Sequence, residues 1–222
     1  MKLILLACAA LLTSGAAPVD WTKRVTSGTN SAYVVGNPKA KVRLVEYLSY
    51  SCSHCADFVG EASAPLKSTY IARGNVAVEF RNAVRDRYDF AAALVARCGG
   101  PAKFVGQNEA LFAAQSSLLA KAQAFEASNT LPENAAVDVA LAGIADGSGM
   151  TALMVARGVP ATTVKACLAN KAEQAAVLGM TKEAWETRKI KFTPTFLING
   201  RDAGPSDWST LQPKLKAALA AR

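Results

Sequence analysis

The hydrophobic positions in the first third of the chain predict a strand, a helix and a second strand. Residues 42–48 form a compact apolar run that is rich in strand-forming side chains. After this run, Phe58 and Leu66 lie on one face of a helical pattern, and residues 76–80 read as a second strand. This order predicts a right-handed crossover between two parallel strands.

Two signals shape the predicted helix. Pro65 lies inside it and predicts a kink, because proline lacks an N–H group and crowds the preceding turn. Gly74–Asn75 predict the end of the helix at about Arg73.

From about Asp86 to Lys189 the pattern is helical almost throughout. Phe90, Leu94 and Cys98 share one helical face, and similar apolar stripes follow between glycine and proline breaks. The segment therefore predicts an all-helical domain inserted into an α/β frame.

The frame resumes near the end of the chain. Thr195–Ile198 predict a strand, and Asn199–Gly200 are a strong signal for a two-residue hairpin. A closing helix should follow, with Ser206 or Ser209 as its N-cap. If Ser209 is the cap, Pro213 falls in the first turn, where its missing N–H is harmless.

The predicted fold class is α/β with an inserted all-helical domain. The predicted parts are a signal peptide at 1–16, an N-terminal segment at 17–39, a first part of the frame at 40–84, the helical insert at 85–190 and a second part of the frame at 191–222.

The first residues have the order of a secretory signal peptide. Lys2 precedes an apolar run from Leu3 to Leu12, and small residues follow up to Ala16 and Ala17, where cleavage is expected. The run is too short to span a bilayer comfortably. An uncleaved anchor and acylation at Cys8 are the alternatives. A signal peptide predicts export to the periplasm.

Composition narrows the classes of function. A chain of 222 residues that is 51% hydrophobic can bury a large core in one or two domains. The formal net charge is +8, but the basic residues are scattered rather than clustered with aromatic residues. We therefore expect no nucleic-acid partner.

The stretch Cys52-Ser53-His54-Cys55 lies where the first strand meets the first helix. A thiolate on Cys52 would face free backbone N–H groups and the positive end of the helix dipole. Both favour the thiolate, lower the thiol pKa and make the sulfur a good leaving group. This position predicts a redox site.

The cysteine pair has two alternative interpretations, a zinc site and a static disulfide. Half of a structural zinc site would need a second Cys/His pair, but His54 is the only histidine, and Cys98 and Cys167 stand alone. A static Cys52–Cys55 bridge would close too short a loop to constrain the unfolded chain much. We expect no metal and no cofactor other than the redox-active disulfide.

Cys98 and Cys167 are left for each other if Cys52 pairs with Cys55 in an oxidising compartment. Their bridge would close a loop of about seventy residues, worth on the order of 4 kcal/mol in the chain-entropy model. The alternative is two buried free thiols that pack as small hydrophobes.

Three blocks of the chain resemble the DsbA-like thiol–disulfide oxidoreductases, which have a thioredoxin fold. They are Glu46–Tyr50, Cys52–Cys55 itself, and Thr193–Phe196 together with Ile198–Gly200. The resemblance implies a thioredoxin-like fold with an inserted helical domain and a periplasmic dithiol oxidase. It also implies two kinds of partner: exported client proteins with free thiols, and a membrane protein of the DsbB type that reoxidises the enzyme.

The resemblance also implies residue roles. Cys52 would be the exposed nucleophile and Cys55 the buried resolving thiol, with His54 stabilising the Cys52 thiolate. Pro194 would be a cis-proline facing this pair, and Thr193 would present backbone groups to an extended client peptide. The alternatives are a solvent-facing His54 without a role and a trans turn proline at Pro194.

Glu46 has an argument of its own. Strand alternation points it toward the same apolar side as Leu44 and Leu48. A buried carboxyl group should have a raised pKa and could exchange a proton with Cys55. The alternative is an ordinary ion pair with a lysine.

Two departures from the family pattern and two rival functions remain open. Ser53 stands where relatives often have proline, and bulky Lys191–Phe192 precede Thr193, so redox potential and client choice are expected to differ. The rivals are an isomerase or reductase kept in the dithiol form, and a non-enzymatic chaperone or soft-metal binder that uses Cys52 and Cys55 as ligands. The isomerase and reductase relatives carry an N-terminal dimerisation domain, for which about two dozen residues leave little room.

Overall fold

The computed structural model describes residues 19–128 and 134–221, and the expected signal peptide, with Cys8, lies outside these residues. Within them, one six-stranded sheet has the strand order β1-β2-β4-β3-β5-β6. The strands are β1 (Val25–Ser27), β2 (Tyr33–Gly36), β3 (Val42–Leu48), β4 (Val76–Asn82), β5 (Thr195–Ile198) and β6 (Arg201–Pro205). The central pair β3 and β4 is parallel, as predicted, and the other pairings are antiparallel.

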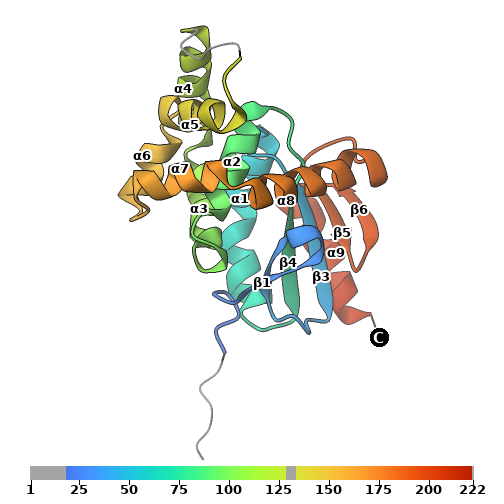
Figure 1. The fold of residues 1–222 in the computed structure, drawn as a ribbon. Helices are drawn as coiled ribbons and strands as arrows, with labels where there is room; N and C mark the ends of the chain where they lie inside the picture. Colours follow the sequence, from blue (N-terminus) through green and yellow to red (C-terminus); the bar gives the residue numbers. More distant parts are fainter. Residues whose placement is uncertain (1–18, 129–133, 222) are drawn as a thin grey trace, which may run out of the picture.

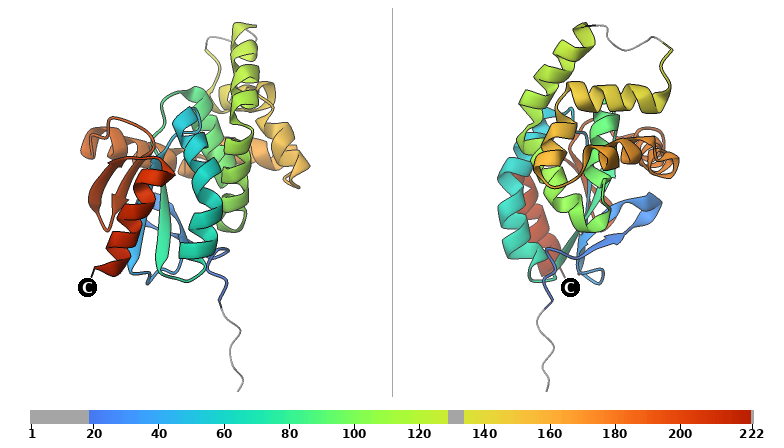
Figure 2. Two further views of the ribbon diagram at one scale, coloured as in Figure 1. Left: turned by 180° about the vertical axis from the view of Figure 1, so that it is seen from behind. Right: turned by 60° about the vertical axis from the view of Figure 1, so that its left-hand side comes forward.

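Helices cover the sheet and extend beyond one end of it (Figure 1). They are α1 (Ser53–Pro65), η2 (Leu66–Ile71), α2 (Arg87–Arg97), α3 (Pro101–Ala113), α4 (Gln115–Ala127), α5 (Val137–Gly147), α6 (Met150–Ala156), α7 (Ala161–Ala169), α8 (Lys171–Lys182), η3 (Glu183–Thr187) and α9 (Trp208–Ala220), with the short η1 (Thr29–Ser31) between β1 and β2. The two views in Figure 2 show α1 and α9 side by side on the face of the sheet opposite α8.

Strand alternation sorts the side chains of β3 between the two faces. Leu44 packs in the core with Phe58 of α1 and Leu211 of α9, whereas Tyr47 packs with Ala184 of η3 on the other face. This register puts Glu46 on the α1 side, next to the helix that carries the cysteine pair.

Pro65 changes the helix type rather than only bending it. The α-helix ends at Pro65, and the chain continues as a π-helical turn to Ile71, closed by a bond from the Ala72 N–H to the Lys67 carbonyl at 2.9 Å. A proline without an N–H disrupts the regular ladder at this point. Gly74 then ends the helical segment with φ of +72°, a conformation that glycine adopts at no steric cost.

The helical segments between β4 and β5 share one core with the end of β3. Leu94, Phe112 and Met150 belong to the same buried cluster as Tyr50 and Cys55. The packing of the helices therefore reaches the residues on either side of Cys52.

A disulfide joins Cys98, directly after α2, to Cys167 in α7 across 69 residues of sequence. It ties the C-terminal end of α2 to α7, so two helices of the insert that are far apart in sequence are linked covalently.

Two sequence expectations were wrong in detail. The N-terminal segment contributes β1 and β2 to the sheet, where no strand was predicted. The closing helix is capped by Asp207, not by Ser206 or Ser209: its carboxylate accepts a bond from the Thr210 N–H at 2.7 Å.

The correct cap also moves Pro213 relative to the helix. With Asp207 as N-cap, Pro213 lies in the second turn and forgoes the bond to the carbonyl of Ser209. A carboxylate both accepts the N–H and complements the helix dipole, which explains why it is favoured over the neighbouring serines.

In the described part of the chain, no single helix has the length and apolarity needed to cross a bilayer. Taken together, α5 and α6 meet these criteria, but the chain bends by 68° between them.

Candidate active site

Cys52 is the N-cap residue of α1, at the point where the loop after β3 becomes helical. Its carbonyl accepts bonds from the N–H groups of Cys55 and Ala56 at 3.1 and 3.3 Å. The side chain of Cys52 thus stands at the positive end of the helix, as the sequence predicts.

The structure shows Cys52 and Cys55 as free thiols. Cys55 is fully buried. Cys52 is also buried, with 7% of its surface exposed, so the expectation of an exposed nucleophile was wrong. The cover comes from the loop before β5, because the Cys52 sulfur lies 3.1 Å from the carbonyl oxygen of Thr193.

The surroundings of Cys52 lower the pKa of its thiol to about 5. The largest cause is a hydrogen bond from the Cys55 thiol, and the Thr193 side chain and the Cys55 backbone N–H add further bonds. Partial burial acts in the opposite direction. The donors outweigh it, so Cys52 is ionised at neutral pH.

Cys55 behaves in the opposite way. Burial raises the pKa of its thiol far above the ordinary value, and the adjacent Cys52 sulfur, for which Cys55 is the donor, raises it further. The pair therefore holds one thiolate and one proton, and the proton is on Cys55.

Glu46 lies in the middle of β3 between Phe80 of β4 and Phe196 of β5. It is 2% exposed, and its Oε1 atom has no hydrogen-bond partner within the described residues. Burial raises the pKa of this carboxyl group to about 8. A cavity of about 40 Å³ lies beside it, between α1 and α3, which is room for about one water molecule.

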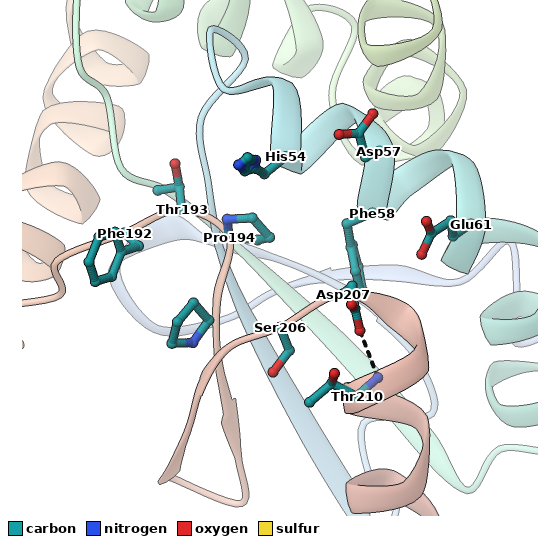
Figure 3. A pocket seen from close by; sticks show the side chains of 11 residues that line it. His54, Asp57, Phe58, Glu61, Phe192, Thr193, Pro194, Ser206, Asp207 and Thr210 are labelled. Atoms are coloured by element: carbon teal, nitrogen blue, oxygen red, sulfur yellow. Dashed lines mark hydrogen bonds between the residues drawn. The ribbon is translucent and has the colours of Figure 1, made fainter.

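The peptide bond between Thr193 and Pro194 is cis. These two residues border a groove of about 570 Å³ that runs from α1 to the start of α9 (Figure 3). Phe58 and Phe192 supply aromatic surface to the same groove. The groove therefore lies next to the Thr193 loop that covers Cys52.

His54 is exposed and lines the groove. The groups that lower the pKa of Cys52 are Cys55, Thr193 and Arg85. The role expected for His54 therefore stays a prediction, and the structure offers Arg85 as the cation near the thiolate.

Two residues of the helical region hold the catalytic loop, residues 49–52 between β3 and α1, and sequence reasoning missed both. Asp89 of α2 accepts bonds from the Ser49 hydroxyl at 2.6 Å and the Tyr50 N–H at 2.7 Å. Gln115 of α4 donates to the carbonyls of Tyr50 and Cys52, each at 2.9 Å. Only the tertiary fold brings these side chains to the loop, so no local pattern could reveal them.

Arg85 reaches the catalytic loop from the segment between β4 and α2. Its guanidinium donates to the Ser51 hydroxyl oxygen at 3.0 and 3.3 Å, and Ser51 in turn donates to Asp86 at 2.7 Å. This fixes a positive charge one residue away from Cys52.

We expect the variant R85A to raise the measured pKa of Cys52 by roughly 0.5, because an exposed charge acts through a high effective dielectric. R85K should restore most of the difference, and 1 M salt should shrink it. R87A is the matched control, since Arg87 pairs with Glu126 on the surface. Absorbance of the thiolate against pH measures all of these, and an unchanged midpoint in R85A would reject the role.

Among the described residues, no group of three or more His, Cys, Asp or Glu side chains is placed to hold a metal ion.

Comparisons with known proteins agree with this geometry. The profile of a family described as Thioredoxin matches residues 28–217. A crystal structure of a protein-disulfide isomerase from Novosphingobium aromaticivorans is 32% identical, with a TM-score of 0.75, over 85% of this chain and 97% of that one. The structure of Wolbachia pipientis alpha-DsbA1 shares the fold at 18% identity and a TM-score of 0.68, over 85% of this chain and 90% of that one.

A relative from Rickettsia conorii, provisionally named a protein-disulfide oxidoreductase, is 26% identical over 186 residues. The match covers 84% of this chain and 60% of the relative, so this chain spans about six-tenths of that protein's length.

Proposed function

The chain belongs to the thioredoxin family, and we propose that it is a thiol–disulfide oxidoreductase of the DsbA type that donates the Cys52–Cys55 disulfide to client proteins. One observation carries the proposal: the two thiols of the pair differ sharply, with the pKa of Cys52 lowered to about 5 and that of Cys55 strongly raised.

The oxidised pair would react in two steps. A client thiolate attacks the sulfur of Cys52, the Cys52–Cys55 bond breaks, and Cys55 leaves as a thiolate that takes up a proton. A second client thiolate then attacks the client sulfur of the mixed disulfide and expels Cys52 as a thiolate. The client loses two electrons and gains a disulfide, and the enzyme is left as the dithiol.

The two pKa values suit the two leaving groups differently. Cys52 leaves readily in the second step, because a thiolate with a low pKa is a good leaving group. Cys55 needs a proton in the first step, and Glu46 is the buried acid on the α1 side of β3 whose charge acts on Cys55. With a pKa raised to about 8, Glu46 is still protonated at neutral pH and can supply that proton.

A stabilised thiolate also sets the direction of the reaction. Every interaction that favours the Cys52 thiolate stabilises the dithiol over the disulfide, and so makes the disulfide a stronger oxidant. Such an oxidant suits the periplasm, where exported proteins would be its clients. A membrane protein of the DsbB type would then reoxidise the enzyme.

A disulfide isomerase is the second candidate, because the 32% identical structure is named a protein-disulfide isomerase. The same Cys52 thiolate could attack a wrong client disulfide if the pair were kept reduced. The choice depends on the reduction potential of the pair.

Equilibration with glutathione at pH 7 tests the proposal. An oxidase should have a potential nearer to about −120 mV, and a reductase one nearer to about −270 mV. In parallel, the oxidised protein should convert a reduced two-cysteine peptide to its disulfide stoichiometrically. A potential near the thioredoxin value, together with rearrangement of a client that carries wrong disulfides, would favour the isomerase.

A further inference from the structure

The groove beside the cysteine pair has an acidic edge. Asp57 and Glu61 line it from α1, and Asp207 lines it from the start of α9 (Figure 3). No lysine or arginine is among its lining residues, although the whole chain has a formal net charge of +8. The groove is thus an acidic site on a basic protein.

The two carboxylates on α1 are available to a ligand. Asp57 and Glu61 are exposed, and neither makes a hydrogen bond or ion pair to any of the residues that the structure describes. Two like charges four positions apart on a helix repel each other, so this arrangement costs stability in the free protein. A cation bound between them would remove that cost.

Two charged groups at the α9 end of the groove are already engaged. The Asp207 carboxylate accepts bonds from the Thr210 N–H and the Ser209 hydroxyl. The ammonium group of Lys214 donates to the carbonyl of Ala203 at 2.7 Å and lies 3.5 Å from the Ser206 hydroxyl. The positive charge of Lys214 is therefore not paired with Asp57 or Glu61.

The remaining surface of the groove is apolar. The ring of Phe58 is buried at its base, the cis-proline Pro194 borders it, and Phe192 is 61% exposed at its edge. A lysine or arginine side chain matches this combination, because its aliphatic stem covers apolar surface while its charged end stays near water and carboxylates.

We propose that this groove selects client segments that carry a lysine or arginine close to the reactive cysteine, with the stem over Pro194 and Phe58 and the charge at Asp57 and Glu61. The proposal rests on the proposed function, because the client cysteine must first be held at Cys52 next to Thr193. An extended chain advances about 3.3 Å per residue, so the basic residue is expected within about four positions of that cysteine.

The experiment measures how fast the oxidised protein oxidises matched two-cysteine peptides. The peptides differ only in carrying lysine, glutamine or glutamate at one position, which is moved through the four residues on each side of the attacking cysteine. At low salt and in the best register, the lysine peptide should react about tenfold faster than the glutamate peptide, and high salt should reduce this ratio.

Variants separate the groove from the overall charge. D57N/E61Q should bring the lysine-to-glutamate ratio close to one, with the rate of each peptide expressed relative to that of the glutamine peptide in the same variant. The control variant D138N/E186Q removes two negative charges that lie outside the groove, and it should keep the wild-type ratio.

A ratio that stays near one in every register, with all peptides oxidised at normal rates, would overturn the inference and leave the proposed function intact. A ratio that survives in D57N/E61Q would also overturn it. If no peptide is oxidised at all, both the inference and the proposed function fail.

Discussion

Replacing Cys52 with serine should lower the rate of client oxidation by at least about a thousandfold, because the serine hydroxyl can neither form the disulfide nor accept electrons from a client. The fold should survive, since the change replaces one small side chain at the N-cap of α1, where serine is a favoured residue. Oxidation of a reduced peptide, followed by trapping of free thiols and mass spectrometry, measures the loss.

Replacing Cys55 with alanine should give a different defect. The remaining Cys52 would attack a client disulfide and form a mixed disulfide that nothing within the enzyme resolves, so the complex should accumulate on a non-reducing gel. The pKa of Cys52 should also rise, since the Cys55 thiol is the largest contributor to its stabilisation. If C52S formed the mixed disulfide through Cys55, or if C55A formed none, the assigned order of attack would be wrong.

Replacing Glu46 with glutamine should stabilise the folded protein at alkaline pH. Burial raises the pKa of Glu46 to about 8, from 4.5 in an unperturbed chain. Between these values the folded protein keeps a proton that the unfolded chain releases, so the wild type loses stability as pH rises. The expected loss is on the order of 4 kcal/mol between pH 4.5 and pH 8.

E46Q should lack this part of the pH dependence, because an amide does not titrate. Urea unfolding of the reduced proteins at several pH values measures the difference between variant and wild type, which should grow as pH rises. E186Q is the control, since Glu186 is exposed and its difference from wild type should stay flat. A flat difference for E46Q would mean that Glu46 is ionised in the folded state at neutral pH.

The same variant should oxidise clients more slowly. Without the acid on the α1 side of β3, Cys55 must leave without a nearby proton donor, and a positioned acid contributes roughly a hundredfold or more in such steps. A gain in stability together with a loss of rate would distinguish a proton donor from a residue that only fills space. Wild-type kinetics in E46Q would count against the proton-transfer role and leave the stability argument untouched.

The sequence predicted the parts of this protein that depend on local pattern. Residues 42–48 form the predicted strand β3, which is almost entirely buried. Cys52 lies after this strand at the start of α1, and Asn199–Gly200 form the hairpin turn between β5 and β6. In each case the deciding interactions lie within a few residues of one another.

Long-range contacts account for what the sequence did not reveal. Val25–Ser27 and Tyr33–Gly36 are too short and irregular to read as strands, and become so by pairing at the edge next to β4. Asp89, Gln115 and Arg85 bind the loop of residues 49–52 from positions 34 to 65 residues away in the chain. Their roles exist only after the helical region has packed against the sheet.

The most direct test of the account is the acid titration of Cys52 in the reduced protein, followed by thiolate absorbance with C52S as the blank. We predict a midpoint near pH 5, well below that of an ordinary thiol. A midpoint of about 8.5, typical of a free cysteine, would mean that the surroundings of Cys52 do not stabilise its anion, and the proposed donor of disulfides would lose its driving force.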